Sequence, residues 1–183
     1  EFINAVVNSY DAIYNSKGEP IFESGNVTCD SLMDVVNEAK DSIFYIVKEL
    51  PETMKQLGRR TVKAFGVKSR FIHLEFFVLN EDQEGLGKKG DVLGLEVNMR
   101  PAGGFTPEMY NYSQETDVYK IWADMIAFDC NTKAIGNSHY CAFFGRRDNK
   151  PYKLDDYEVM MKYGHKMVMW GRIPEALSGA MAN

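Results

Sequence analysis

The side chains with the clearest chemical capacity lie on two short apolar segments, residues 71–79 (FIHLEFFVL) and 92–100 (VLGLEVNMR). Their spaced polar members are Glu75 in the first segment and Glu96, Asn98 and Arg100 in the second. Successive strand side chains point to opposite faces, so a hairpin of these segments would gather the two acids and the amide on one surface, with the arginine beyond them. Carboxylate and amide oxygens are hard ligands that suit Mg²⁺ or Mn²⁺ bridging phosphate oxygens.

The same pattern is also typical of an antiparallel sheet that carries solvated acids on its open face. In either case the alternating apolar residues should seal a core, and these are Leu93, Leu95, Val97 and Met99. Arg100 could merely pair with one of the two acids. His73 shares the face of Glu75 and could join a transition-metal site, although a packed or hydrogen-bonded histidine is more common. The residue types alone leave these alternatives open.

The remaining pattern predicts an α+β fold, an antiparallel sheet backed by helices. The clearest helix is residues 51–65, with Pro51 at its first position, Gly66 ending it, and an inward stripe of Met54, Leu57, Thr61 and Phe65. Further helices are expected at 106–112, 116–128, 155–163 and in a final tail. Further strands are expected at 1–14, from 21, and at 42–47, 139–144 and 166–170, and the segment 24–41 is expected to be an irregular loop.

Composition restricts the classes of function. The chain has 183 residues, which suits one domain, and a net charge of −5, which argues against bulk nucleic-acid binding. No apolar run approaches the roughly 20 residues that a membrane helix needs. The three cysteines lack C-x-x-C spacing, so buried or partly buried free thiols in a reducing cytoplasm are expected. We therefore expect a soluble protein of the cytoplasm that does not bind nucleic acid in bulk.

Residues 74–76 (LEF) followed by 95–104 (LEVNMRPAGG) resemble the C-terminal lobe of ATP-grasp enzymes such as biotin carboxylase and the large subunit of carbamoyl phosphate synthetase. Glu-x-Asn-x-Arg alone is a weak motif. The upstream Glu, the Pro-x-Gly-Gly sequel and the preceding helix make the resemblance more specific. It covers residues 1–128, and residues 129–183 are expected to form a C-terminal extension that packs on this lobe.

The resemblance implies roles for individual residues. Glu75 and Glu96 would ligate Mg²⁺, Asn98 would complete a second ion, and Arg100 would hold the transferred phosphate or an acyl phosphate. The expected nucleotide and substrate contacts are Phe2 and Ile3 at the adenine, Gly103 and Gly104 where the backbone approaches the substrate, and Asn37 and Glu38 in a substrate-side loop.

The implied reaction is ATP-dependent activation of a carboxylate as an acyl phosphate, which an amine, ammonia or a thiol then attacks. The implied cofactors are ATP and Mg²⁺, or Mn²⁺, and the partners are the two small-molecule substrates, with a homodimer as one option. Because the chain starts inside a strand-like pattern without Met, we expect a fragment whose N-terminal lobe is missing and which is inactive alone. The alternative is a non-catalytic nucleotide-binding scaffold or regulatory module with the same fold.

Overall fold

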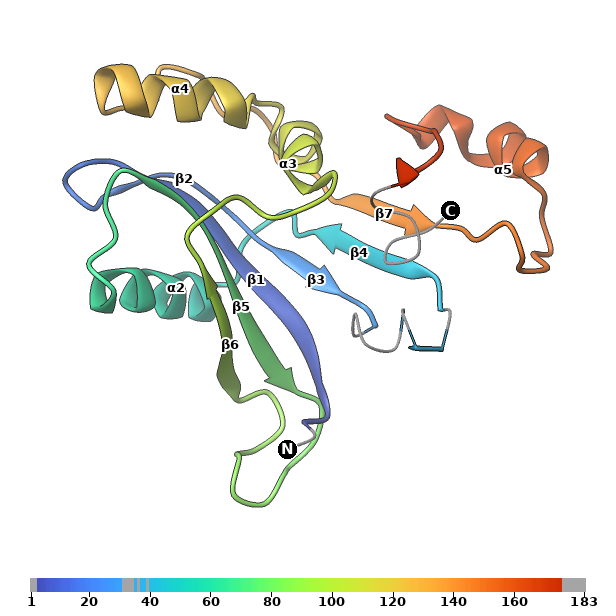
Figure 1. The fold of residues 1–183 in the computed structure, drawn as a ribbon, viewed down its shortest axis with the longest axis horizontal. Helices are drawn as coiled ribbons and strands as arrows, with labels where there is room; N and C mark the ends of the chain where they lie inside the picture. The colour runs from blue at the N-terminus through green and yellow to red at the C-terminus, as the bar shows by residue number, and fades with distance from the viewer. Residues whose placement is uncertain (1–2, 31–34, 36, 39, 176–183) are drawn as a thin grey trace.

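A computed structural model describes residues 3–30, 35, 37, 38 and 40–175 of the chain. Its centre is a seven-stranded antiparallel sheet in the order β6-β5-β1-β3-β4-β7, with β2 also paired to β1 (Figure 1). The strands are β1 (Ala5–Tyr14), β2 (Pro20–Ser24), β3 (Asn26–Thr28), β4 (Ser42–Ile46), β5 (Arg70–Leu79), β6 (Val92–Asn98) and β7 (Cys141–Gly145). The helices are α2 (Glu52–Ala64), α3 (Thr106–Gln114), α4 (Val118–Phe128) and α5 (Asp156–Tyr163), followed by the 3-10 helix η1 (Gly164–Lys166). The predicted α+β class is confirmed.

Helices cover the two faces of the sheet, because residues of β1 and β5 alternate between them. Helix α2 packs on one face over Tyr10, Ile72 and Leu74. Helices α3 and α4 pack on the other face, where Ile13 and Phe71 belong to their core cluster. Figure 1 shows α2 on the opposite side of the sheet from α3 and α4. This second face also carries the candidate site, beyond the part that the two helices cover.

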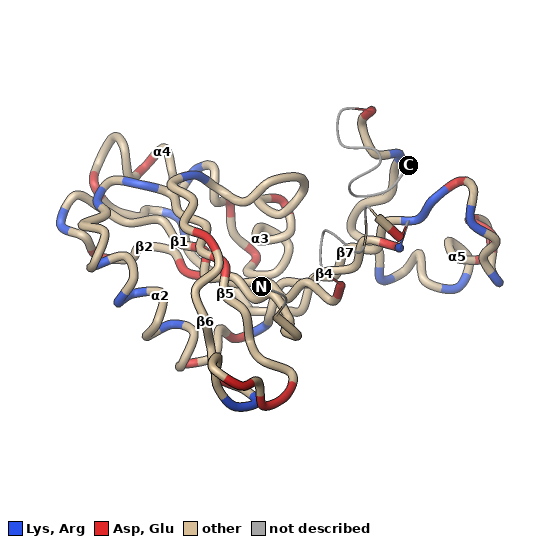
Figure 2. Tube along the Cα trace, turned by 60° about the horizontal axis from the view of Figure 1, so that its bottom comes forward, with Lys and Arg blue, Asp and Glu red and all other residues tan. Residues whose placement is uncertain are grey.

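Helix α2 lies within one residue of its predicted limits, and Pro51 is its N-cap rather than its first residue. The predicted inward stripe is right for Met54, which is buried, and for Leu57, which is partly buried against the core, but it is wrong for Phe65. The buried positions are Met54, Gly58 and Val62, whereas Phe65 is 60% exposed. The buried set follows the i, i+4 row, on which a glycine lets the helix axis come close to the sheet. The exposed side of α2 carries basic residues (Figure 2).

Two other expectations are wrong. The segment expected to be an irregular loop contains β3, whose three residues are too few to show a strand pattern in sequence but pair with both β1 and β4. Residues 166–170, expected to be a strand, begin at the last residue of the short helix η1 and are not part of the sheet. The predicted final helical tail falls largely at 176–183, outside the described residues. The boundary expected at residue 128 stays a prediction.

The edge strand β6 does not seal a core as predicted. Leu95, Val97 and Met99 are 43%, 37% and 38% exposed. A register shift between Glu75 and Phe76 breaks the expected alternation, so that the four apolar side chains no longer share one face. At the rim of the sheet, this strand packs mainly against β5. The connection from β5 to β6 carries acidic and basic residues at its tip (Figure 2).

Two observations bear on the expected environment. No helix within the described ranges is both long and apolar enough for a membrane span. All three cysteines are free thiols; Cys141 is partly buried as predicted, whereas Cys29 and Cys130 are exposed, so their predicted burial is wrong.

Glu23 joins α2 to the sheet. Its carboxylate accepts a hydrogen bond from Arg59 Nε at 2.8 Å and one from the Tyr10 hydroxyl at 2.6 Å. Burial opposes ionisation of Glu23, but the hydrogen bonds from Arg59 and Tyr10 and the charge of the guanidinium outweigh it, and the pKa of Glu23 is lowered from its ordinary 4.5. The ionised carboxylate therefore stabilises the fold.

We expect Glu23→Gln to lower the free energy of unfolding at neutral pH by about 2 kcal/mol, the scale of a charged hydrogen bond. A lowered carboxyl pKa contributes stability that is present above the unfolded value of 4.5 and is lost as the pH falls through the lower folded value. The difference between the proteins should therefore shrink in acid. Urea unfolding at stepwise lower pH measures it, with the exposed Glu84→Gln as control. A difference that is independent of pH would contradict this account.

Candidate functional site

The centre of the candidate site is a carboxylate pair on β5 and β6. Glu75 is the cross-strand partner of Glu96, and His73 is the partner of Asn98. Direct partners project from the same face of a sheet, so all four side chains share one surface. The Glu75 side chain is 27% exposed and Glu96 is exposed, so solvent reaches this pair. The structure thus brings together the acids and the amide that the sequence singled out.

Asn98 has an uncommitted side chain. Its amide nitrogen is buried and has no hydrogen-bond partner among the described residues. Buried polar atoms are rarely left unpaired, and such an exception calls for an explanation. An amide without a protein partner can turn its oxygen toward a bound cation, so Asn98 fits the ligand set that Mg²⁺ prefers.

Arg100 lies just beyond the end of β6 and is exposed. Its Nη1 donates to the carbonyl of Pro101 at 3.0 Å. In the described part of the chain no ion pair joins Arg100 to Glu75 or Glu96, so the simple pairing that we considered for it is not formed. The guanidinium stands near enough for its charge to help lower the pKa of Glu75. Arg100 is therefore available to an anionic ligand beside the carboxylates.

A buried histidine stands behind Glu75. His73 is 7% exposed, its Nδ1 lies 2.6 Å from Asp11 Oδ1, and its Nε2 lies 3.2 Å from Glu75 Oε1. Burial disfavours the imidazolium, but the charge of Asp11 and the hydrogen bonds to both carboxylates outweigh it and raise the pKa of His73 to about 10. The packed and hydrogen-bonded role expected as the commoner one is confirmed.

The hydrogen bond from His73 is the main cause that lowers the pKa of Glu75, and it acts against the effect of burial. Glu75 is thus kept as a carboxylate in a partly buried place. An ionised oxygen ligand is what a divalent cation requires. Both nitrogens of His73 are engaged by carboxylates, and the described residues contain no group of three or more His, Cys, Asp and Glu side chains that could hold a metal ion. In this arrangement neither ring nitrogen of His73 is free to ligate a transition metal.

Asp11 was missed by the sequence analysis. It lies in β1 directly opposite His73 and is fully buried. The available signal was an acid inside a strand of mostly apolar residues (AVVNSYDAIY), on the same alternation as Ser9. An unpaired buried carboxylate is costly, so such an acid indicates a partner on a neighbouring strand.

The two glycines of the motif lie in the loop between β6 and α3. A Cβ added at Gly103 would meet open space, and Gly104 has a positive φ of 60°. No protein group crowds Gly103, so the protein's own packing does not demand a glycine there. The loop is open to an incoming ligand at this point.

The remaining predicted contacts are not brought to the carboxylate pair. Asn37 and Glu38 are exposed in the segment between β3 and β4, and the carboxylate of Glu38 pairs with Lys40 at 2.9 Å. In the sheet order β1 stands between these strands and β5. Ile3 is partly buried just before β1, while Phe2 lies outside the described residues.

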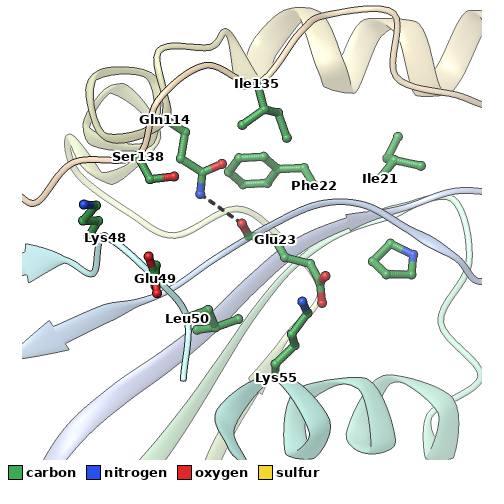
Figure 3. Close-up of a pocket in the computed structure, with 11 residues that line it drawn as sticks. Ile21, Phe22, Glu23, Lys48, Glu49, Leu50, Lys55, Gln114, Ile135 and Ser138 are labelled. Carbon is green, nitrogen blue, oxygen red and sulfur yellow. Dashed lines mark hydrogen bonds between the residues drawn. The ribbon is translucent and has the colours of Figure 1, made fainter. Parts of the chain in front are cut away.

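A separate hollow of about 420 Å³ opens beside the edge of β2 (Figure 3). Its wall includes Lys48, Glu49 and Lys55, and Gln114 Nε2 donates to the backbone oxygen of Glu23 at 3.0 Å. None of the residues that line it is a predicted site residue. Charges of both signs border it, so the hollow does not select an anionic or cationic ligand.

The chain was compared with protein-family models, curated proteins and solved structures. Neither the protein-family models nor the curated proteins give a match. Among solved structures, the sheet with its helices is similar to phosphoribosylglycinamide synthetase from Anaerococcus prevotii, with a TM-score of 0.53 and 18% identity over 75% of this chain and 34% of that chain. The likeness to ATP-grasp enzymes is confirmed at the level of the fold.

A second solved structure agrees. It is the biotin carboxylase domain of a thermophilic 2-oxoglutarate carboxylase bound to bicarbonate, with a TM-score of 0.51 and 16% identity over 78% of this chain and 30% of that chain. The present chain therefore spans about a third of the length of each protein. At such identities the similarity shows a shared fold over this part of both proteins and leaves activity to be argued from the site.

Proposed function

We propose that this chain is the ATP-binding and Mg²⁺-binding half of an ATP-dependent ligase that joins a carboxylate to an amine, ammonia or a thiol through an acyl phosphate. The observation that carries the proposal is the pairing of Glu75 with Glu96 on one face of the sheet, next to the uncommitted amide of Asn98. The ATP-grasp fold supports it, because both compared proteins are ATP-grasp enzymes.

In this proposal Glu75, Glu96 and Asn98 hold the cation, and Arg100 holds the transferred phosphate. Mg²⁺, when bound, would neutralise the charge of the triphosphate and orient it for transfer. The side chains of this lobe supply position and charge rather than a nucleophile. Glu75 is suited to this role because its carboxylate is kept ionised.

The proposal also includes contacts to the adenine and to the substrate. Phe2 and Ile3 would cover the adenine, and Gly103 and Gly104 would admit the substrate to the backbone. Asn37 and Glu38 would contact substrate only if a part of the protein outside these residues closes over them. Because the chain spans about a third of the compared proteins, we propose that a further lobe completes the ATP site and that these residues alone are inactive. The free thiols favour the cytoplasm as its location, and a homodimer stays a prediction.

The test is release of ADP by the complete polypeptide that contains this chain. With Mg²⁺ and ATP, one carboxylate and amine pair from a panel should raise ADP release above the rate without substrates by about 100-fold, the size of a modest catalytic effect. Chelation of the cation should abolish the stimulation. Tight Mg²⁺-dependent ATP binding with no ADP release across the panel would instead identify a nucleotide-binding scaffold.

A further inference from the structure

We infer that Asp11 and His73 are positioning residues, which hold the carboxylate of Glu75 in the orientation that binds the divalent cation. This inference rests on the proposed function, since it assigns to Glu75 the role of a cation ligand. It adds two residues from outside the Glu-x-Asn-x-Arg motif. The carrying observation is a continuous line of hydrogen bonds that crosses three strands and ends on Glu75.

The line begins inside the sheet. The backbone N–H of Asn26 donates to Ser9 Oγ at 2.8 Å, and the Ser9 hydroxyl donates to Asp11 Oδ2. The other oxygen of Asp11 lies 2.6 Å from His73 Nδ1. The last contact joins His73 Nε2 to Glu75 Oε1 over 3.2 Å.

The direction of each bond follows from the first. Ser9 Oγ accepts from a backbone amide, so its own proton is free to be given to Asp11. One oxygen of Asp11 then contacts Ser9 and the other contacts His73. With Nδ1 held by Asp11, the plane of the imidazole is set and Nε2 is aimed at Glu75.

Burial makes this arrangement rigid. Ser9 is 2% exposed, Asp11 is fully buried and His73 is 7% exposed, so none of the three can swing into solvent. Sheet pairing places them in register, with Asp11 opposite His73 and Ser9 opposite Glu75. Glu75 is the member that reaches the surface, so the line connects the rigid interior of the sheet to one oxygen of the proposed cation ligand.

Holding one oxygen of Glu75 leaves the other to face the cation without a loss of side-chain freedom on binding. Partners that orient a metal-binding carboxylate or histidine typically contribute about 10- to 100-fold to metal affinity or activity. In the line from Ser9 to His73, the orienting partner is His73, which contacts the proposed ligand Glu75 and not the ion.

Two variants of His73 separate positioning from packing. In His73→Asn the amide nitrogen replaces Nδ1, so the bond to Asp11 is kept and the contact with Glu75 is lost. In His73→Gln the amide nitrogen replaces Nε2, so the contact with Glu75 is kept and the bond to Asp11 is lost. If His73 only stabilises the interior, His73→Asn should be the better tolerated variant in every measurement.

The experiment titrates Mn²⁺ into the complete polypeptide with a non-hydrolysable ATP analogue, followed by electron paramagnetic resonance, and measures unfolding in parallel. We expect His73→Asn to weaken Mn²⁺ binding by about 10- to 100-fold. His73→Gln should retain more of the affinity although it is the less stable variant. The control is His139→Asn, because His139 Nε2 contacts Glu115 Oε1 at 2.9 Å at an exposed place and should not affect Mn²⁺.

The outcomes distinguish this inference from the proposed function. Wild-type Mn²⁺ affinity in His73→Asn, together with a loss in Glu75→Gln, would overturn the positioning role alone. Wild-type affinity in both variants would overturn the proposed function. Should the His73 variants fail to fold, the isosteric Asp11→Asn provides the test, since it too should weaken Mn²⁺ binding, and unchanged affinity would overturn the inference.

Discussion

Glu96→Gln should lower the Mg²⁺- and ATP-dependent turnover of the complete polypeptide by about 100-fold or more, the scale of losing one preorganised charge at the reacting phosphate. The substitution keeps the size of the side chain and removes the negative charge beside Glu75. The fold should be unaffected, because Glu96 is exposed on the edge strand β6. Steady-state ADP release measures the effect, and circular dichroism with thermal unfolding checks the fold.

The matched control is Glu84→Gln, which removes the same charge from the exposed connection between β5 and β6. Its turnover should equal that of the wild type. If Glu96→Gln retains full turnover, Glu96 is not part of the site. If both variants lose activity equally, the effect is one of net charge rather than of cation binding.

Gly58→Ala should lower the free energy of unfolding by about 3 kcal/mol, at the upper end of overpacking costs. A Cβ at this position of α2 would overlap the Tyr10 ring, with Cδ1 and Cδ2 only 2.5 Å away. The ring cannot yield, because Tyr10 is fully buried and its hydroxyl lies 2.8 Å from the Tyr14 hydroxyl and 2.6 Å from Glu23. In an open helix the same change would add about 1 kcal/mol of stability, so the expected sign is itself diagnostic.

Urea unfolding measures this prediction, and Thr53→Ala on the exposed surface of the same helix is the control. The control should be neutral or slightly stabilising, because alanine has the higher helix propensity. An equal or increased stability of Gly58→Ala would show that α2 can move away from β1. The close packing described for this glycine would then be wrong.

The sequence could predict much of the fold because the signals for its elements are local. Alternation marks β5 and β6, and the pair of Pro51 and Gly66 limits α2 to within one residue. Regular spacing also predicts that Glu96 and Asn98 share a face, since that depends only on the period of a strand. The short strand β3 carries no local signal, because it is a strand only through its pairing with β1 and β4.

The pairing of Glu75 with Glu96 could not be predicted in full from the local sequence pattern. That Glu75 and Glu96 could meet followed from a hairpin, but their direct opposition depends on a register shift next to Glu75. The same irregularity, together with the position of β6 at the rim, leaves Val97 and Met99 exposed where a core was expected. Side-chain alternation cannot indicate whether another element will cover a strand.

The amino-acid sequence by itself determined the residue types, the strand spacing and the likeness to the ATP-grasp lobe, because these depend on neighbours along the chain. Only the tertiary structure decided that Asp11 and His73, 62 residues apart, meet behind Glu75. The physical reason is that a buried charge is tolerated only with a partner, and which partner is within reach depends on how β1 and β5 align side by side.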